Sequence, residues 1–433
     1  MNGDLLANDR ERSRLVRLSK HMRCARPPFS QEFCYNHQIS SQLVLSSLRL
    51  GKSLPKQLLW MRKRDAKKLW VNITTADSWE HVNKIFHRLN LSEIQTLCIW
   101  ESHNGNLKRN KTFLFQRILK SIVRLPIRAL ISFTVHVKCF SFVNHVYRLL
   151  RRIKGFKDLS LNYEWGYCFR SQEIGQIAPF SGACKTLHIS LPSPGKLENI
   201  GHIVNDSRWN PLRGLDLSGN NIGDVGAGVL SGNLTWKMLR SLDLSSNKLG
   251  VEGLTALAAN TTWDSLIELN LWNNIPGVRG IRALAGNRSW VRLEKLDLTL
   301  CLIGVEEIRA LVTNVSWKSL RCLGLRLNQI QDNGVKILAS NNPWPQLEKL
   351  ILTKNSVTSI GAQALAANTN WKNLKNLGLN HNQLGDAGAA LLATNITWEN
   401  LGILQLQGNG ISEEGLQSLK SNKTWKCTIE IIL

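Results

Sequence analysis

Three regularly spaced aspartates are the side chains in this chain with the clearest catalytic potential. Asp216 and Asp243 are 27 residues apart, and Asp297 follows after two more intervals of that length. Carboxylates on adjacent strands, which lie about 4.8 Å apart, can act as a general acid and base. The same spacing also fits solvated side chains on one face of a sheet, and we favour this interpretation. Because no H-E-x-x-H, P-loop or G-x-S-x-G motif is present, we predict no catalytic residue and no enzyme activity.

A second group of chemically capable residues lies near the N-terminus. His21, Cys24, Cys34 and His37 form two pairs of a kind that can bind zinc tetrahedrally. Their order and spacing differ from those of standard zinc fingers, so we predict neither a metal site nor a cofactor. The nine cysteines of the chain are odd in number and include no C-x-x-C pair. They favour a reducing compartment over a disulfide framework.

The elements that would position such residues follow from an internal repeat. Tryptophans recur every 27 residues from Trp209 to Trp425 without a gap. If Leu212 is position 1, then positions 1, 4, 6 and 19 are leucine, position 22 is asparagine and position 25 is tryptophan in every repeat. Position 9 is asparagine except at Cys301. A fixed period of this length is typical of a solenoid that presents a long surface to a partner.

The two halves of each repeat predict different elements. Leucines at positions 4 and 6 alternate with small or polar residues, which predicts a short strand with one buried face. Asparagine at position 9, stacked from repeat to repeat, is expected to satisfy buried backbone groups along the array. The second half is helical in spacing, and we expect Asn260, at position 22, to cap that helix in the left-handed conformation. We expect the tryptophan to fill the core and its indole N–H to have an acceptor.

This pattern resembles the leucine-rich repeat, L-x-x-L-x-L-x-x-N/C-x-L, and its length is similar to that of the ribonuclease-inhibitor-like subclass. The resemblance covers residues 212–433 and departs from the subclass at position 25, where tryptophan stands in place of leucine. It implies an α/β leucine-rich repeat solenoid (horseshoe), with parallel strands on the concave face and short helices on the convex face. It also implies roles such as inhibitor, immune sensor, bacterial effector or activator of small GTPases, among which the residues do not choose.

Three regions differ in how well they match the repeat. Residues 212–433 are regular, residues 61–211 are interpreted as degenerate and strongly basic repeats, and residues 1–60 are expected to form a basic N-terminal cap or arm. In the degenerate region we expect strands around Leu69, Leu97, Leu130, Leu159 and Leu187, and at the other end of the chain one around Ile431.

Charge is distributed unevenly along the chain. Residues 1–200 carry 33 basic and 13 acidic side chains, a net charge of +20, whereas residues 201–433 carry 22 and 18, a net charge of +4. The basic half predicts an acidic partner, which would be nucleic acid, an anionic surface or an acidic protein. No nucleic-acid-binding motif is present, so solvated basic side chains are the preferred interpretation. Because we find neither a signal segment nor a run of about 18 apolar residues, we expect no membrane span and a cytoplasmic or other reducing intracellular location.

We place the predicted binding site on the concave face. Positions 3, 5 and 7 point away from the buried leucines, and tryptophan and arginine are frequent binding hot spots. We therefore expect Trp272, as an exposed aromatic, and Arg326 to be central to an interface with a protein; the alternative is that Trp272 only covers neighbouring backbone. The other residues of the predicted site lie around them: Asp216, Asp243, Glu268, Asn270, Lys295 and Asp297.

These features predict a monomeric, non-catalytic scaffold that binds a protein partner on the concave face. A first alternative is a binder of nucleic acid or of an anionic surface that works through residues 1–200. Binding that weakens steeply as salt rises would favour it. A second alternative is a regulator of a small GTPase.

Overall fold

The computed structural model describes residues 198–341 and 344–425, together with the backbone of seven further strands. The chain divides into two units, Met1–Gln42 and Leu43–Leu433, and the description that follows concerns the second. Among the described residues, no helix combines the length and the apolar character that crossing a bilayer requires.

The strands form one parallel sheet in which neighbours in space are also neighbours in sequence. The strands outside the regular repeats are β1 (Gln42–Leu45), β2 (Lys68–Ile73), β3 (Thr96–Glu101), β4 (Ser132–Val137), β5 (Asp158–Tyr163), β6 (Thr186–Ile189) and β15 (Glu430–Ile432). Those of the regular repeats are β7 (Gly214–Asp216), β8 (Ser241–Asp243), β9 (Glu268–Asn270), β10 (Lys295–Asp297), β11 (Cys322–Gly324), β12 (Lys349–Ile351), β13 (Asn376–Gly378) and β14 (Ile403–Gln405).

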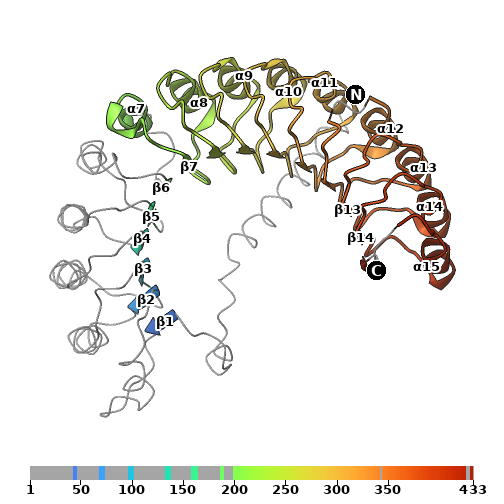
Figure 1. Ribbon diagram of the computed structural model, residues 1–433. Helices are drawn as coiled ribbons and strands as arrows, with labels where there is room; N and C mark the ends of the chain where they lie inside the picture. Colours follow the sequence, from blue (N-terminus) through green and yellow to red (C-terminus); the bar gives the residue numbers. More distant parts are fainter. Residues whose placement is uncertain are drawn as a thin grey trace, which may run out of the picture. The chain divides into compact units, whose positions relative to one another are not determined.

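A helix follows each strand of the regular repeats. The described helices are α7 (Glu198–Val204), the 3-10 helix η4 (Ser207–Trp209), α8 (Gly223–Ser231), α9 (Val251–Ala259), α10 (Gly277–Gly286), α11 (Val305–Leu311), α12 (Gln331–Asn341), α13 (Ser359–Ala366), α14 (Gly385–Leu392) and α15 (Glu413–Lys420). From β7 to β14 the strands line the inner, concave side of the array, and the helices lie on its outer side (Figure 1). The expected α/β solenoid of parallel strands and short helices is confirmed.

The strands of the degenerate region lie where the leucine pattern predicts them, with one exception. The predicted strand around Leu130 is misplaced by three residues. In β4, Phe133 is the residue that pairs with Leu97 on one side and with Leu159 on the other. An aromatic residue suits a strand well, and Phe133 occupies the register position that leucine has in the two neighbouring strands. At the C-terminal end, Ile431 pairs with the preceding strand as expected.

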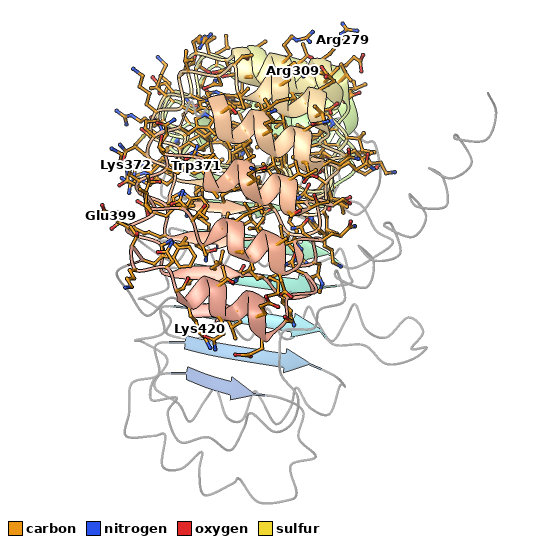
Figure 2. All side chains as sticks on the ribbon, turned by 90° about the vertical axis from the view of Figure 1, so that its right-hand side faces the viewer. Arg279, Arg309, Trp371, Lys372, Glu399 and Lys420 are labelled. Carbon is orange, nitrogen blue, oxygen red and sulfur yellow. The ribbon has the colours of Figure 1, made fainter. Side chains whose placement is uncertain are left out.

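The core of each regular repeat lies between its strand and its helix. The leucines at positions 1, 4, 6 and 19 are at most 3% exposed, and the tryptophans from Trp209 to Trp398 at most 1%. Neighbouring indoles stack in places, as Trp236 and Trp263 do at 6.4 Å between ring centroids. Trp371 lies inside the array, whereas the next residue, Lys372, points out from its edge (Figure 2). The prediction that position 25 fills the core is confirmed.

The prediction about the indole N–H is wrong. None of the nine indole nitrogens at position 25 has a hydrogen-bond partner. An unmade buried bond costs about 1–3 kcal/mol. Burying a large apolar side chain contributes a similar or larger amount, about 1.5–3 kcal/mol. Each indole can therefore stabilise the core through its ring even though its N–H remains without an acceptor.

The asparagines at position 9 form a ladder through the turns, as predicted. Asn274 Oδ1 accepts the backbone N–H of Asn247 at 3.1 Å and of Leu249 at 2.9 Å in the preceding repeat. Its Nδ2 donates to the carbonyls of Leu244 at 3.0 Å and Leu271 at 2.8 Å. One side chain thus satisfies four backbone groups and joins two repeats.

The asparagines at position 22 form a second ladder at the helix ends. Asn260 Oδ1 accepts the backbone N–H of Trp263 at 3.2 Å, and its Nδ2 donates to Ser231 and Asn233 of the preceding repeat, both at 2.8 Å. Asn260 has φ −71° and ψ 119°, so it is extended, and the expected left-handed cap is wrong. The extended backbone lets the side chain reach back one repeat while its oxygen closes the turn before Trp263.

Candidate functional site

The residues of the predicted site do share the inner face of the sheet. In register, Asp216 lies beside Asp243, Asp243 beside Asn270, and Asn270 beside Asp297. Glu268 lies beside Lys295 at position 3. Side chains at these positions alternate with fully buried leucines, which is why the strands present them on one face.

The side chains at position 5 are bound by the backbone and are not freely solvated, which corrects our expectation. In each of four consecutive repeats, the Oδ1 atom at position 5 accepts the backbone N–H at position 7 of the same repeat. The pairs are Asp216 with Ser218 at 2.8 Å, Asp243 with Ser245 at 2.8 Å, Asn270 with Trp272 at 3.0 Å, and Asp297 with Thr299 at 2.8 Å. These side chains are partly buried. They fix the backbone where each strand ends, and this local role explains the choice of aspartate or asparagine.

Burial perturbs the carboxyl group of Asp243. Burial raises the pKa of its carboxyl above the usual value and the charge of Asp216 raises it further, while hydrogen bonds from Ser245 and Asn270 lower it in part. Asn270 Nδ2 donates to Asp243 Oδ2 at 2.8 Å. Both carboxylate oxygens therefore already have donors within the array, which argues against the acid–base alternative for the aspartate row.

Two of the three charged residues at position 3 form a pair. Lys295 and Glu268 form an ion pair on adjacent strands, and the hydrogen bond and charge of Glu268 raise the pKa of Lys295. Both side chains are largely exposed, so the pair adds little to stability. Cys322 lies in register between Lys295 and Lys349, and burial raises the pKa of its thiol. Glu268 is therefore already paired with a cation of its own chain.

Trp272 and Arg326 both lie at position 7, two repeats apart, with Thr299 between them. Trp272 is partly buried, so it is less accessible than the expected exposed aromatic. The Arg326 guanidinium forms no ion pair with any described residue, and its buried Nε atom has no hydrogen-bond partner. Strands about 4.8 Å apart place the two residues about 10 Å from each other. An aromatic ring and an unpaired cation thus lie on the same face.

Two sets of residues escaped the sequence analysis. The first is an aspartate at position 13, which caps the helix of the next repeat. Asp332 accepts the backbone N–H groups of Thr358 at 2.8 Å and Gly361 at 3.0 Å, and the Thr358 hydroxyl at 2.7 Å. Asp224 and Asp386 act in the same way. The sequence signal for this cap was an aspartate at position 13 together with glycine, threonine or serine at position 12 of the next repeat.

The second set is position 8, which is left-handed in every regular repeat. Positive φ favours glycine, asparagine and other small polar residues. The sequence signal was a departure from this preference. Leu300 and Leu327 occupy position 8 in two consecutive repeats, with φ of 56° and 57°.

Several predictions fall outside the described residues. These include the possible zinc ligands His21, Cys24, Cys34 and His37, and the basic side chains of residues 1–200 other than the described part of α7. Within the part of the chain that the structure describes, no group of three or more histidine, cysteine, aspartate or glutamate side chains could hold a metal ion.

Comparison with family models identifies repeats in the regular array. A family model described as Leucine Rich repeat matches residues 210–231, 237–258, 318–339 and 372–393. No curated protein matches the chain. Among solved structures, the complex of Rad7 and Elc1 from yeast matches with a TM-score of 0.47 and 15% identity, over 87% of this chain and 83% of that chain. An internalin (inlF) from Listeria monocytogenes strain 4b F2365 matches with a TM-score of 0.37 and 15% identity, over 82% and 88%.

Proposed function

Because this chain is a leucine-rich repeat protein, we propose that it is a non-catalytic scaffold that binds a protein partner on the concave face of its regular repeats. The ribonuclease-inhibitor-like subclass remains a prediction. The observation that carries the proposal is the unpaired Arg326 guanidinium near Trp272 on the inner face. A cation that forms no ion pair with the described residues of its own chain is available to a carboxylate of another protein.

The surroundings of these two residues also suit a protein interface. The Asp243 carboxylate already has donors, and Glu268 already has a cationic partner, so a partner need not neutralise either group. Aromatic and arginine side chains commonly dominate the binding energy of an interface, and their neighbours mainly exclude water. We therefore assign the central role to Trp272 and Arg326, and a surrounding role to Asp216, Asp243, Glu268, Asn270, Lys295 and Asp297.

The test is affinity capture from cell lysate with the full chain, with and without nuclease. A Trp272→Ala/Arg326→Ala variant removes the two central side chains. An Arg279→Ala/Arg309→Ala variant is the matched control, because both of these arginines are exposed on helices of the outer face (Figure 2). The proposal expects a protein that survives nuclease, is lost with the first variant and is retained by the second.

A different result would move the function elsewhere in the chain. Capture that disappears with nuclease and ignores both variants would favour nucleic-acid binding through residues 1–200, whose net charge is +20. Capture that survives nuclease but ignores the Trp272→Ala/Arg326→Ala change would contradict the assignment of the concave face.

A further inference from the structure

The left-handed residues at position 8 form a continuous row along one edge of the inner face. From Gly219 to His381, each of these residues donates its backbone N–H to the position 7 carbonyl of the next repeat, as Leu300 does to Arg326 and Leu327 to Thr353, both at 2.9 Å. These bonds continue the ladder of the sheet and hold successive position 8 residues at the spacing of strands. We call Leu300, Leu327, Lys354 and His381, which occupy this position in four consecutive repeats, the rim row.

The two leucines of the rim row are not residues that a left-handed backbone prefers. In the flanking repeats position 8 is Gly219, Ser246, Asn273 or Gly408, which suit positive φ because they are small or bond locally. Leucine is disfavoured there because its Cβ approaches the following carbonyl oxygen. Asn273 shows that asparagine is compatible with this turn, so folding alone does not explain two consecutive leucines. Backbone outliers of this kind concentrate at functional sites.

The rim row changes in chemistry along its length. Leu300 and Leu327 are partly exposed and apolar. At position 10, Leu302 is partly exposed and Ile275 of the preceding repeat is 50% exposed, and these side chains add to the apolar surface. Lys354 is exposed and forms no ion pair with a described residue.

Arg326 extends the cationic part of this surface. It precedes Leu327 in the chain and lies one strand away from Thr353, the residue before Lys354. Its guanidinium forms no ion pair with a described residue, and its buried Nε atom has no hydrogen-bond partner among them. An apolar surface therefore adjoins two unpaired cations, and the two kinds of surface lie side by side along the array.

We infer that the rim row and Arg326 bind a peptide segment of a protein partner in which apolar residues are followed, in one direction or the other, by acidic residues. The inference rests on the proposed function, whose partner it describes. Apolar side chains of the segment would cover the two leucines, and its carboxylates would pair with Arg326 and Lys354. A nucleic acid would satisfy the cations but would leave the leucines uncovered, so a peptide fits better.

The size of the row sets the length of the segment. Three strand intervals of about 4.8 Å separate Leu300 from His381, which gives about 14 Å. A helix rises 1.5 Å per residue, so about ten helical residues would span the row. An extended peptide would span it in about four or five residues.

The test is selection of a phage-displayed library of random sixteen-residue peptides on the purified full chain. We expect enriched peptides to combine apolar residues with neighbouring aspartate or glutamate. Leu300→Asn/Leu327→Asn should weaken the binding of a selected peptide at least tenfold. Arg326→Gln/Lys354→Gln should also weaken it and reduce its dependence on salt. Lys248→Asn, at an exposed left-handed position outside the row, is the matched control and should not change binding.

The variants should fold normally, because asparagine tolerates positive φ better than leucine does. A melting temperature within a few degrees of wild type would confirm this for each variant. Failure to enrich any peptide, or peptides whose binding ignores both double variants, would overturn the inference. If the captured cellular protein depends on Trp272 but ignores Leu300→Asn/Leu327→Asn, the proposed function stands and this inference fails.

Discussion

Replacing Asn274 by alanine should destabilise the array far more than replacing an exposed asparagine. Asn274 is 2% exposed, and its Oδ1 atom accepts the N–H groups of Asn247 and Leu249 at 3.1 and 2.9 Å. Each buried donor that loses its acceptor costs about 1–3 kcal/mol. The loss of two acceptor contacts therefore predicts a decrease of about 2–6 kcal/mol in the free energy of unfolding.

Urea unfolding of the full chain, followed by tryptophan fluorescence and circular dichroism, measures this decrease. The buried tryptophans report directly on the packing of the repeats. Asn400→Ala is the matched control, because Asn400 is exposed and makes one hydrogen bond, from Nδ2 to the carbonyl of Lys372 at 2.9 Å. We expect that control to cost less than about 1 kcal/mol.

The slope of the urea unfolding curve reports whether the repeats unfold together. Repeat proteins can unfold in parts, so a broadened transition in Asn274→Ala would itself indicate uncoupled repeats. If Asn274→Ala and Asn400→Ala unfold at the same urea concentration with the same slope, the reasoning about the asparagine ladder is refuted.

Three further predictions follow from other contacts. Cys301→Asn should stabilise the array by no more than about 1 kcal/mol in thermal unfolding, because the asparagine would gain the N–H of Asn274 but face Pro276, which has no N–H to donate; a gain of several kcal/mol would contradict this. Asp332→Ala should cost about 2 kcal/mol in the same assay through loss of the bonds from Thr358 and Gly361, and an unchanged melting temperature would show that the cap contributes nothing. The pH dependence of unfolding should separate wild type from Asp243→Asn. Burial raises the pKa of Asp243 in the folded state, so its contribution to stability is present below the unfolded pKa of about 4 and declines as pH rises through the folded pKa. The free energy of unfolding of wild type relative to Asp243→Asn should therefore decrease as pH rises from the unfolded pKa through the folded pKa, and stay constant above it. An increase with pH would contradict this prediction.

The repeat pattern predicted the fold because each of its residues has one dominant physical role. A leucine at position 4 or 6 must be buried, and an asparagine at position 9 must serve the turn, whatever the partner of the protein is. The strand at Phe133 was misplaced because the interval before it is longer than one repeat, and a lone leucine at Leu130 was the only guide. Asn260 was misjudged because its conformation depends on carbonyls in the preceding repeat, which a single repeat does not contain.

The candidate site was less predictable, since its side chains serve both folding and function. The sequence correctly placed Asp243 and Asn270 on one face but did not reveal that they bind backbone and each other. It indicated Arg326 as a hot spot by residue type alone, whereas the absence of a partner for its guanidinium becomes visible only when its neighbours are placed. The left-handed backbone of Leu300 could have been inferred from Gly219, Asn273 and Gly408 at the same position of other repeats, but leucine itself gives no sign of positive φ.

Site-specific photo-crosslinking in cells is the most direct test of a concave binding face. A photoreactive amino acid would replace Trp272 in one variant and Arg309, on the outer helix α11, in the other. The account predicts that position 272 crosslinks a discrete protein partner and that position 309 does not. Crosslinks to the same partner from position 309, with none from position 272, would place the interface on the outer face and contradict the account.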